Sequence, residues 1–209
     1  HLASSFLEEV RRRYAGTRLG RQELDGVLLS DAEGALWTSE MIEAAQVDKP
    51  PALDRVVVAV DPVVSSGAGA DECGIVVVGA VTKGPPQDWR AYVLADCTVA
   101  GLSPSGWAKA ATCAMERFGA DRLVAEVNQG GQMVAEVIRQ VDPLVPYKAV
   151  HATRGKVARA EPVAVLYEQG RVFHVSGGLD DRVDALVWAL HELMIEPAAV
   201  WRRPTVRSL

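Results

Sequence analysis

From about residue 56 onward, apolar runs separated by turn-forming residues predict a series of strands. Residues 56–60 are continuously branched or small apolar residues and end at Asp61, which is typical of a strand buried on both faces. Residues 74–81 and 89–99 form two further apolar runs. Because only short turns separate them, the three runs predict an antiparallel meander.

After the meander, apolar positions recur at helical spacing and alternate with short strands. Ser103 is a good helix cap, Pro104 would occupy the first helical position, and Gly119 would end that helix. A strand is expected at residues 123–127, a helix at 133–141, a strand at 145–151, a helix at 161–169, and a last helix from Asp180 or Asp181 to about Met194. This order predicts an α/β fold in which a mixed sheet is flanked by helices.

The first 50 residues have a different pattern from the rest. They contain short amphipathic pieces interrupted by Gly16 and Gly20, and they end in Lys49-Pro50-Pro51. We therefore expect an N-terminal extension or linker over residues 1–50 and the main domain over residues 51–209.

Composition narrows the partners and the location. The chain has 209 residues and a formal net charge of −5, so passive coating of nucleic acid is disfavoured, although carboxylates gathered at a metal site would themselves make a protein acidic. No apolar run approaches the roughly 20 residues of a membrane span. The N-terminus has no signal-peptide pattern, so we expect a cytoplasmic protein that is neither secreted nor membrane-bound.

Asp61, Glu126 and Asp184 lie in apolar surroundings, where an ionised acid is costly. Asp61 ends the first strand, Glu126 lies in the run LVAEV, and Asp184 lies in the last helix. Each acid alone could pair with an arginine or lysine. Together, on a central strand, its neighbour and a helix crossing their ends, they predict one site for hard divalent cations such as Mg²⁺ or Mn²⁺.

Two other acids are weaker candidates for metal ligands. Asp181 lies three residues before Asp184 and would project from the same helix face, although it could equally serve as a helix cap. Asp71 follows the first strand in a loop and could assist a metal or simply precede the next strand.

A basic cluster follows the predicted fifth strand. Arg154, Lys156 and Arg159 lie close together in TRGKVAR, and mobile cations beside a metal site would suit the phosphate backbone of DNA. The alternative is a solvated start of a helix.

Several segments resemble the C-terminal nuclease domain of terminase large subunits, which phages, prophages and gene transfer agents encode. These segments are VVVAVDPVVSSGAGADECGIVVVG, LVAEVNQGGQMV, HATRGKVARAEPVAVLYEQGRV and DRVDALVWAL. GTRLGRQELDG and GALWTSEMIEAA resemble the segment that joins the terminase ATPase to this nuclease. The resemblance covers about residues 1–195 and implies a ribonuclease H-like fold.

The resemblance also implies an activity, which is metal-dependent endonucleolytic cleavage of double-stranded DNA during viral genome packaging. The acids of the family fall on Asp61, Glu126 and Asp184. Two Mg²⁺ or Mn²⁺ ions about 4 Å apart would clamp the scissile phosphate, with Asp61 between them. In the full-length protein, an ATPase domain, the portal and the small terminase subunit are the expected partners, in the cytoplasm of a bacterial host.

The sequence departs from the family pattern at two points. No G-x-x-x-x-G-K-[ST] motif is present, so translocation is not expected of this piece. The residues 177–179 lead almost directly to Asp180, where the family has a longer connection.

Other classes of protein stay open on the sequence. They are another ribonuclease H-like nuclease such as a junction resolvase or an RNA:DNA hydrolase, a sugar-kinase or actin-like ATPase, and a non-catalytic module that docks on a portal or small subunit. The ATPase fold requires a glycine-rich phosphate loop after the first acid, and DPVVSSG fits that poorly.

Overall fold

The computed structural model describes residues 39–62, 72–127, 131–153, 155–175 and 183–197. The chain divides into two compact units, His1–Ala44 and Ala45–Leu209. The described part of the first unit is the short helix α3 (Ser39–Ala44). Gln46 and Val47, which the sequence placed in the N-terminal extension, form strand β1 in the sheet of the second unit. The predicted domain boundary after residue 50 stays a prediction.

The described part of the second unit alternates strands and helices. Its strands are β1 (Gln46–Val47), β2 (Arg55–Asp61), β3 (Glu72–Val81), β4 (Arg90–Asp96), β5 (Val99–Ala100), β6 (Arg122–Glu126), β7 (Tyr147–Val150) and β8 (Val172–Val175). Its helices are η1 (Pro86–Asp88), α4 (Pro104–Phe118), α5 (Gly131–Val141), α6 (Lys156–Glu168), α7 (Val183–Leu190) and the π-helical turn η2 (His191–Ile195).

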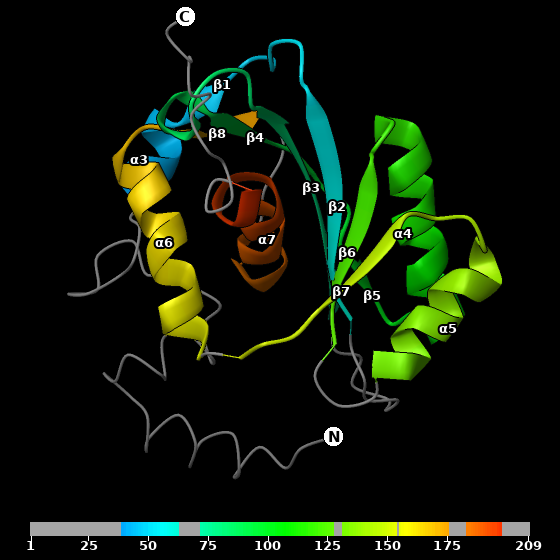
Figure 1. Cartoon of the computed structure of the whole chain (residues 1–209). Coiled ribbons are helices and arrows are strands. Elements are labelled where there is room, and N and C mark those ends of the chain that lie inside the picture. Colours follow the sequence, from blue (N-terminus) through cyan, green and yellow to red (C-terminus); the bar gives the residue numbers. More distant parts are fainter. Residues whose placement is uncertain (1–38, 63–71, 128–130, 154, 176–182, 198–209) are drawn as a thin grey trace, which may run out of the picture. The chain divides into compact units, whose positions relative to one another are not determined.

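The strands form one mixed sheet in the order β1-β8-β4-β3-β2-β6-β7, and β5 pairs with β3 (Figure 1). Strands β2, β3 and β4 are antiparallel neighbours, which confirms the predicted meander. On one side, β6 and β7 continue the sheet in parallel with β2, and on the other side β8 and β1 run parallel with β4. The predicted mixed sheet is therefore confirmed.

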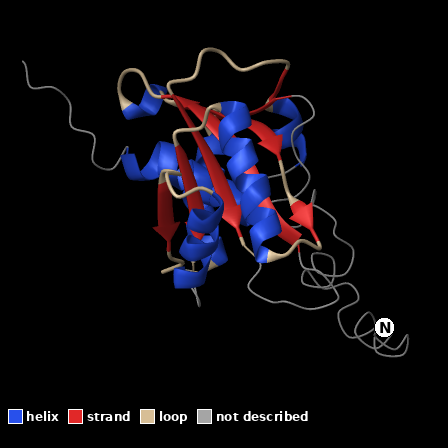
Figure 2. Ribbon diagram, turned by 90° about the vertical axis from the view of Figure 1, so that its right-hand side faces the viewer, coloured by secondary structure: helices blue, strands red, loops and turns tan. Residues whose placement is uncertain are grey.

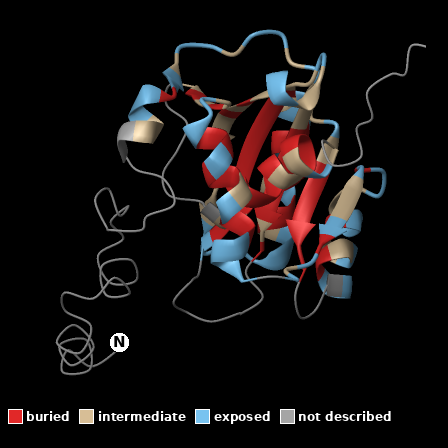
Figure 3. Cartoon of the chain, turned by 60° about the vertical axis from the view of Figure 1, so that its left-hand side comes forward, coloured by how far each residue is buried: buried red, intermediate tan, exposed pale blue. Residues whose placement is uncertain are grey.

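Helices cover both faces of this sheet. Helices α4 and α5 lie on one face and α6 and α7 on the other (Figure 1). Figure 2 shows helices packed against the strands. The middle of β2 is fully buried between these layers, as its continuous apolar run predicted, and the buried strands are visible in Figure 3. Helix α4 begins as predicted, because the Ser103 hydroxyl accepts the Gly106 amide at 3.3 Å, and it ends at Gly119 with φ of 57°.

The third strand is shorter than the sequence indicated. Strand β4 ends at Asp96, whose carboxylate accepts the amide of Thr98 at 2.8 Å and so turns the chain. The chain then forms β5, which pairs with the start of β3. The predicted single strand over residues 89–99 was wrong because this local side-chain turn interrupts it.

Two further differences concern strand β8 and helix α6. Strand β8 was absent from the predicted element order, although it lies between β4 and β1 in the sheet. Helix α6 begins at Lys156, several residues before the predicted start at residue 161, and Pro162 lies inside the helix rather than near its beginning. Lys156 and Arg159 are therefore three positions apart on one helix and share a face.

Candidate active site

Asp61 and Glu126 end two neighbouring parallel strands. Strands β2 and β6 pair with Val60 opposite Ala125, so the next residue of each strand is an acid, and both acids reach the same edge of the sheet. Glu126 is 8% exposed. Strands β2 and β6 are thus two neighbouring buried apolar strands that each end in an acid at this edge of the sheet.

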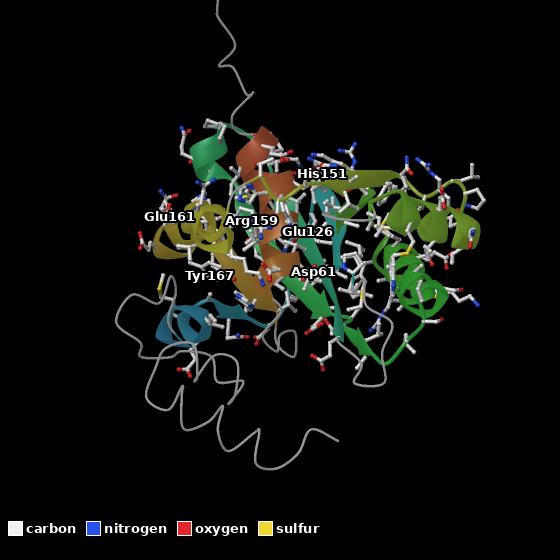
Figure 4. The ribbon with its side chains drawn as sticks, turned by 90° about the horizontal axis from the view of Figure 1, so that it is seen from below. Asp61, Glu126, His151, Arg159, Glu161 and Tyr167 are labelled. Carbon is white, nitrogen blue, oxygen red and sulfur yellow. The ribbon has the colours of Figure 1, made fainter. Side chains whose placement is uncertain are left out.

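Helix α7 brings the third acid to this edge. Asp184 is the second residue of α7, and the helix packs against β2, β3 and β6. The closeness is clearest at Gly74, where an added Cβ would lie 3.6 Å from both the Cβ of Asp61 and the Cβ of Ala185. Asp61 and Glu126 also lie near each other when the side chains are viewed from below (Figure 4). The three acids predicted from the sequence therefore gather in one place.

The other two acids influence the ionisation of Asp61. The pKa of Asp61 is raised from 3.8 to about 6, first because burial penalises the charged form, and then because Glu126 and Asp184 are negative. Lys156 and Arg159 partly oppose this shift. An additional positive charge beside Asp61 would therefore favour its ionised form.

Glu126 is held by two donors on different helices. The indole Nε1 of Trp188 donates a hydrogen bond to Glu126 Oε2 at 2.6 Å, and Arg159 Nη1 approaches the same oxygen at 3.3 Å. All three residues are buried. The sequence assigned Trp188 to the core, and its position one turn after Asp184 on the same helix was the available signal for a role at the site.

Asp184 is paired with both cations of α6. Lys156 Nζ donates to Asp184 Oδ2 at 2.8 Å, and Arg159 Nη2 lies 3.8 Å from Asp184 Oδ1. The hydrogen bond to Asp184 is the main reason that the pKa of Lys156 is raised. Lys156 and Arg159, the two described residues of the basic cluster, therefore each contact an acid of the site.

Arg159 is the most embedded member of this cluster. Its guanidinium lies 4.9 Å from the centre of the Trp188 ring, and its backbone carbonyl accepts a hydrogen bond from His191 Nε2 at 2.9 Å. Figure 4 shows Arg159 on α6 directed toward Glu126, whereas Glu161 of the same helix points away. In the structure, the side chain of Arg159 is directed toward the carboxylates of Glu126 and Asp184. The expected contact of Arg159 with DNA stays a prediction.

Some predicted site residues lie outside the described residues. These are Asp71, Asp181 and Arg154, together with Asn128, Gln129 and Gly130, which follow β6. Their predicted roles stay predictions.

The chemistry of the donor set fits a divalent cation, because the three acids offer hard oxygen ligands from three rigid elements. Within the described ranges, however, no group of three or more His, Cys, Asp or Glu side chains is already arranged to hold a metal. Glu126 and Asp184 are instead directed toward Arg159 and Lys156. The three acids lie close together, and the positive charges that pair with Glu126 and Asp184 are those of Arg159 and Lys156 on α6.

A second charged cluster lies at the opposite edge of the sheet. Glu192 of η2 is buried and pairs with Arg122 at 2.7 Å, Lys148 at 2.6 Å and Arg55 at 3.4 Å, which lie at or near the starts of β6, β7 and β2. Burial opposes the ionisation of Glu192, but Lys148 and Arg122 outweigh it and lower its pKa. This cluster was not found from the sequence, because its members are far apart in the chain.

Comparison with known protein families identifies the family of the chain. Residues 58–178 match the terminase RNaseH-like domain family. Because the match covers more than half of the chain, the chain belongs to this family, which confirms the resemblance and the ribonuclease H-like fold. Asp61 and Glu126 lie inside the matched region, and Asp184 lies beyond it. No curated protein sequence matches the chain.

Several solved structures are similar to this chain at low sequence identity. The manganese-soaked terminase nuclease domain of human cytomegalovirus is 15% identical with a TM-score of 0.50, over 74% of this chain and 94% of that one. The large terminase of a thermophilic bacteriophage, in complex with ATP-γ-S, is 14% identical with a TM-score of 0.50, over 85% of this chain and 42% of that one. RuvC of Thermus thermophilus is 19% identical with a TM-score of 0.41, over 65% of this chain and 90% of that one.

None of the helices in the described part of the chain is both long and apolar enough to span a membrane.

Proposed function

We propose that this chain is the nuclease part of a terminase large subunit and that it cleaves double-stranded DNA during viral genome packaging. The observation that carries the proposal is the convergence of Asp61, Glu126 and Asp184 at one edge of the sheet, close enough for the other two acids to raise the pKa of Asp61. Membership of the terminase RNaseH-like domain family supports the same reaction class.

Asp61, Glu126 and Asp184 are the proposed ligands of two divalent cations, Mg²⁺ or Mn²⁺, with Asp71 and Asp181 as further candidates. When bound, the cations would supply an activated water and stabilise the charge on the leaving oxygen. The manganese in the soaked cytomegalovirus nuclease supports a divalent cation for a fold of this kind. Asp61 is the acid whose pKa both other acids raise, and it is proposed to contact both cations.

The chain's own residues would orient the reacting groups. Trp188 and Arg159 fix the carboxylate of Glu126, and the rigid ends of β2 and β6 fix the spacing of Glu126 from Asp61. Lys156 is largely exposed and, with Arg154, is proposed to contact the DNA phosphates. Contacts of this kind hold the backbone without reading its sequence, so little sequence preference is expected.

The proposed setting follows from the family. In the full-length protein, an ATPase domain would drive the DNA past this site, and the portal and small terminase subunit would be its partners in the cytoplasm of a bacterial host. The large terminase of the thermophilic phage supports an ATPase in the same chain, since it was solved with ATP-γ-S and this chain covers 42% of it.

The test is cleavage of supercoiled plasmid by the 209-residue chain with Mn²⁺ or with chelator. We expect nicked and linear products with Mn²⁺ alone, and their loss in Asp61→Asn. The matched control is Asp54→Asn, an exposed acid that immediately precedes the start of β2, whereas Asp61 is at the other end of this strand; the Asp54 carboxylate accepts the Thr82 amide. Cleavage by Asp61→Asn at the wild-type rate would contradict the site, and a strong preference for a four-way junction over plasmid would favour a resolvase.

A further inference from the structure

The two cations that α6 places at the acids differ in how they are held. The side chain of Arg159 is 8% exposed and contacts Glu126, Asp184 and the Trp188 ring. The side chain of Lys156 is 77% exposed and forms an ion pair with Asp184. One cation is embedded in the protein, whereas the other reaches the site from solvent.

We propose that Arg159 is a permanent positioning residue for Glu126 and Asp184, and that Lys156 is a displaceable counter-ion that occupies Asp184 until a divalent cation takes its place. The inference rests on the proposed function, because it concerns how the same acids receive their metal.

The contacts of Arg159 favour a fixed role. Its Nη1 bonds to Glu126 and its Nη2 lies near Asp184, and its guanidinium carbon lies 4.9 Å from the centre of the Trp188 ring, whose Nε1 itself donates to Glu126. His191 binds the Arg159 backbone carbonyl, so the base of the side chain is held as well. Removing such a residue would take a positive charge away from the buried Glu126, which is unfavourable.

The contact of Lys156 favours exchange. An exposed ion pair contributes little free energy, because water solvates both charges almost as well when they separate. A divalent cation beside Asp184 would replace this weak pair with direct ligation and would repel the ammonium group. Lys156 would then be released at the rim of the site, where an incoming DNA phosphate needs a positive charge.

The arrangement of the acids supports this exchange. Within the described ranges, the acids are not already arranged as a metal cage, and the two paired acids are directed toward the α6 cations. The charges of Glu126 and Asp184 are thus balanced by Arg159 and Lys156. On this proposal, a divalent cation enters when the ion pair between Lys156 and Asp184 opens.

The proposal predicts that substitutions of Lys156 and Arg159 change the affinity for Mn²⁺ in opposite directions. Isothermal titration calorimetry with Mn²⁺ alone, on the whole chain without DNA, measures the affinity directly. Lys156→Gln removes the competitor and should tighten Mn²⁺ binding by about 1.5-fold to fivefold, the range expected for an exposed pair. Arg159→Gln should weaken Mn²⁺ binding, and Arg159→Lys should restore part of it, since a lysine can neutralise one acid but cannot bridge two.

A matched control separates this effect from a change in net charge. Lys83 pairs with Asp54 at 3.3 Å on an exposed surface, so Lys83→Gln removes the same charge from an ion pair that does not involve the acids of the site. We expect it to leave the Mn²⁺ affinity unchanged. Thermal melts in chelator show which variants fold, and Lys156→Gln should fold because its side chain is exposed.

The outcomes distinguish the two proposals. If the wild-type chain gives no Mn²⁺ binding, the proposed metal site fails and this inference fails with it. If the wild type binds Mn²⁺ but Lys156→Gln binds equally well or more weakly, the displaceable counter-ion is refuted while the proposed function stands. If Arg159→Gln folds and binds Mn²⁺ as tightly as the wild type, the positioning role of Arg159 is refuted.

Discussion

Replacing Asp61 with asparagine should stabilise the metal-free protein while abolishing its metal site. The pKa of Asp61 is raised from 3.8 to about 6 by burial and by Glu126 and Asp184, so the ionised form is disfavoured in the folded chain. A raised pKa of an acid means that the folded state holds its proton more tightly than the unfolded state does. Folding therefore loses stability as the pH rises from about 4 to about 6, and the full cost persists above that window.

The size of this cost follows from the raised pKa. A change of one in a pKa corresponds to about 1.4 kcal/mol in the free energy of ionisation, and Asp61 is partly exposed, so we expect about 2 to 3 kcal/mol for its ionisation in the folded, metal-free chain. An asparagine side chain at this position would carry no charge at any pH. Asp61→Asn should therefore unfold at higher urea concentration than the wild type at about pH 8, and the two should converge near pH 4.

Urea unfolding in chelator, followed by circular dichroism at several pH values, measures this difference. Asp54→Asn is the control, because a hydrogen bond from the Thr82 backbone amide lowers the pKa of Asp54 and neutralising it should bring no gain. Adding Mn²⁺ should reverse the order, since only the wild type gains a ligand that binds the native state. If Asp61→Asn is no more stable than the wild type at about pH 8 in chelator, the repulsion among the acids is not as described.

Three other substitutions test separate parts of the molecule. Saturating Mn²⁺ should raise the melting temperature of the wild type, and Glu126→Gln should lose at least half of that rise, whereas equal rises would speak against Glu126 as a ligand. Burial lowers the pKa of His174 to about 4, so the contribution of His174 to stability should increase with pH between about 4 and 6.5, by about 3 kcal/mol at most and opposite in sign to the contribution of Asp61; a wild-type dependence of stability on pH in His174→Gln would contradict this. Glu192→Gln removes the shared partner of Arg122 and Lys148 and should cost about 2 kcal/mol in urea unfolding; a loss below about 0.5 kcal/mol would refute it.

The central strands and the first long helix could be predicted because their signals are local. The apolar run of β2 and the capping residues of α4 determine those elements whatever surrounds them. Strand β8 carries a weaker signal, since it has only four residues and a histidine among them. His174 is tolerated there because Tyr167 of α6 bonds its Nε2 at 2.7 Å, and that contact depends on the assembled fold.

The acids of the site could be predicted from the sequence because their signals are also local. The residues that contact these acids could not be predicted. An acid at the end of an apolar strand is conspicuous, as with Asp61 and Glu126. The roles of Arg159 and Trp188 depend on how α6 packs against α7, and no spacing along the chain encodes that packing. Pro162 added to the difficulty, because proline is usual in the first turn of a helix and here lies well inside α6.

The position of Asp184 depends on contacts at both ends of the segment that carries it. Glu192 lies eight residues beyond Asp184, about 12 Å along a helix, and it is held by cations at the starts of the strands that end in the acids. The side chains of Arg55, Arg122 and Lys148 reach Glu192 from residues at or near the starts of β2, β6 and β7. Because Glu192 pairs with cations at the strand starts, a displacement of α7 along the sheet would break several ion pairs at once. These ion pairs therefore help to hold Asp184 at the edge of the sheet where the other two acids lie.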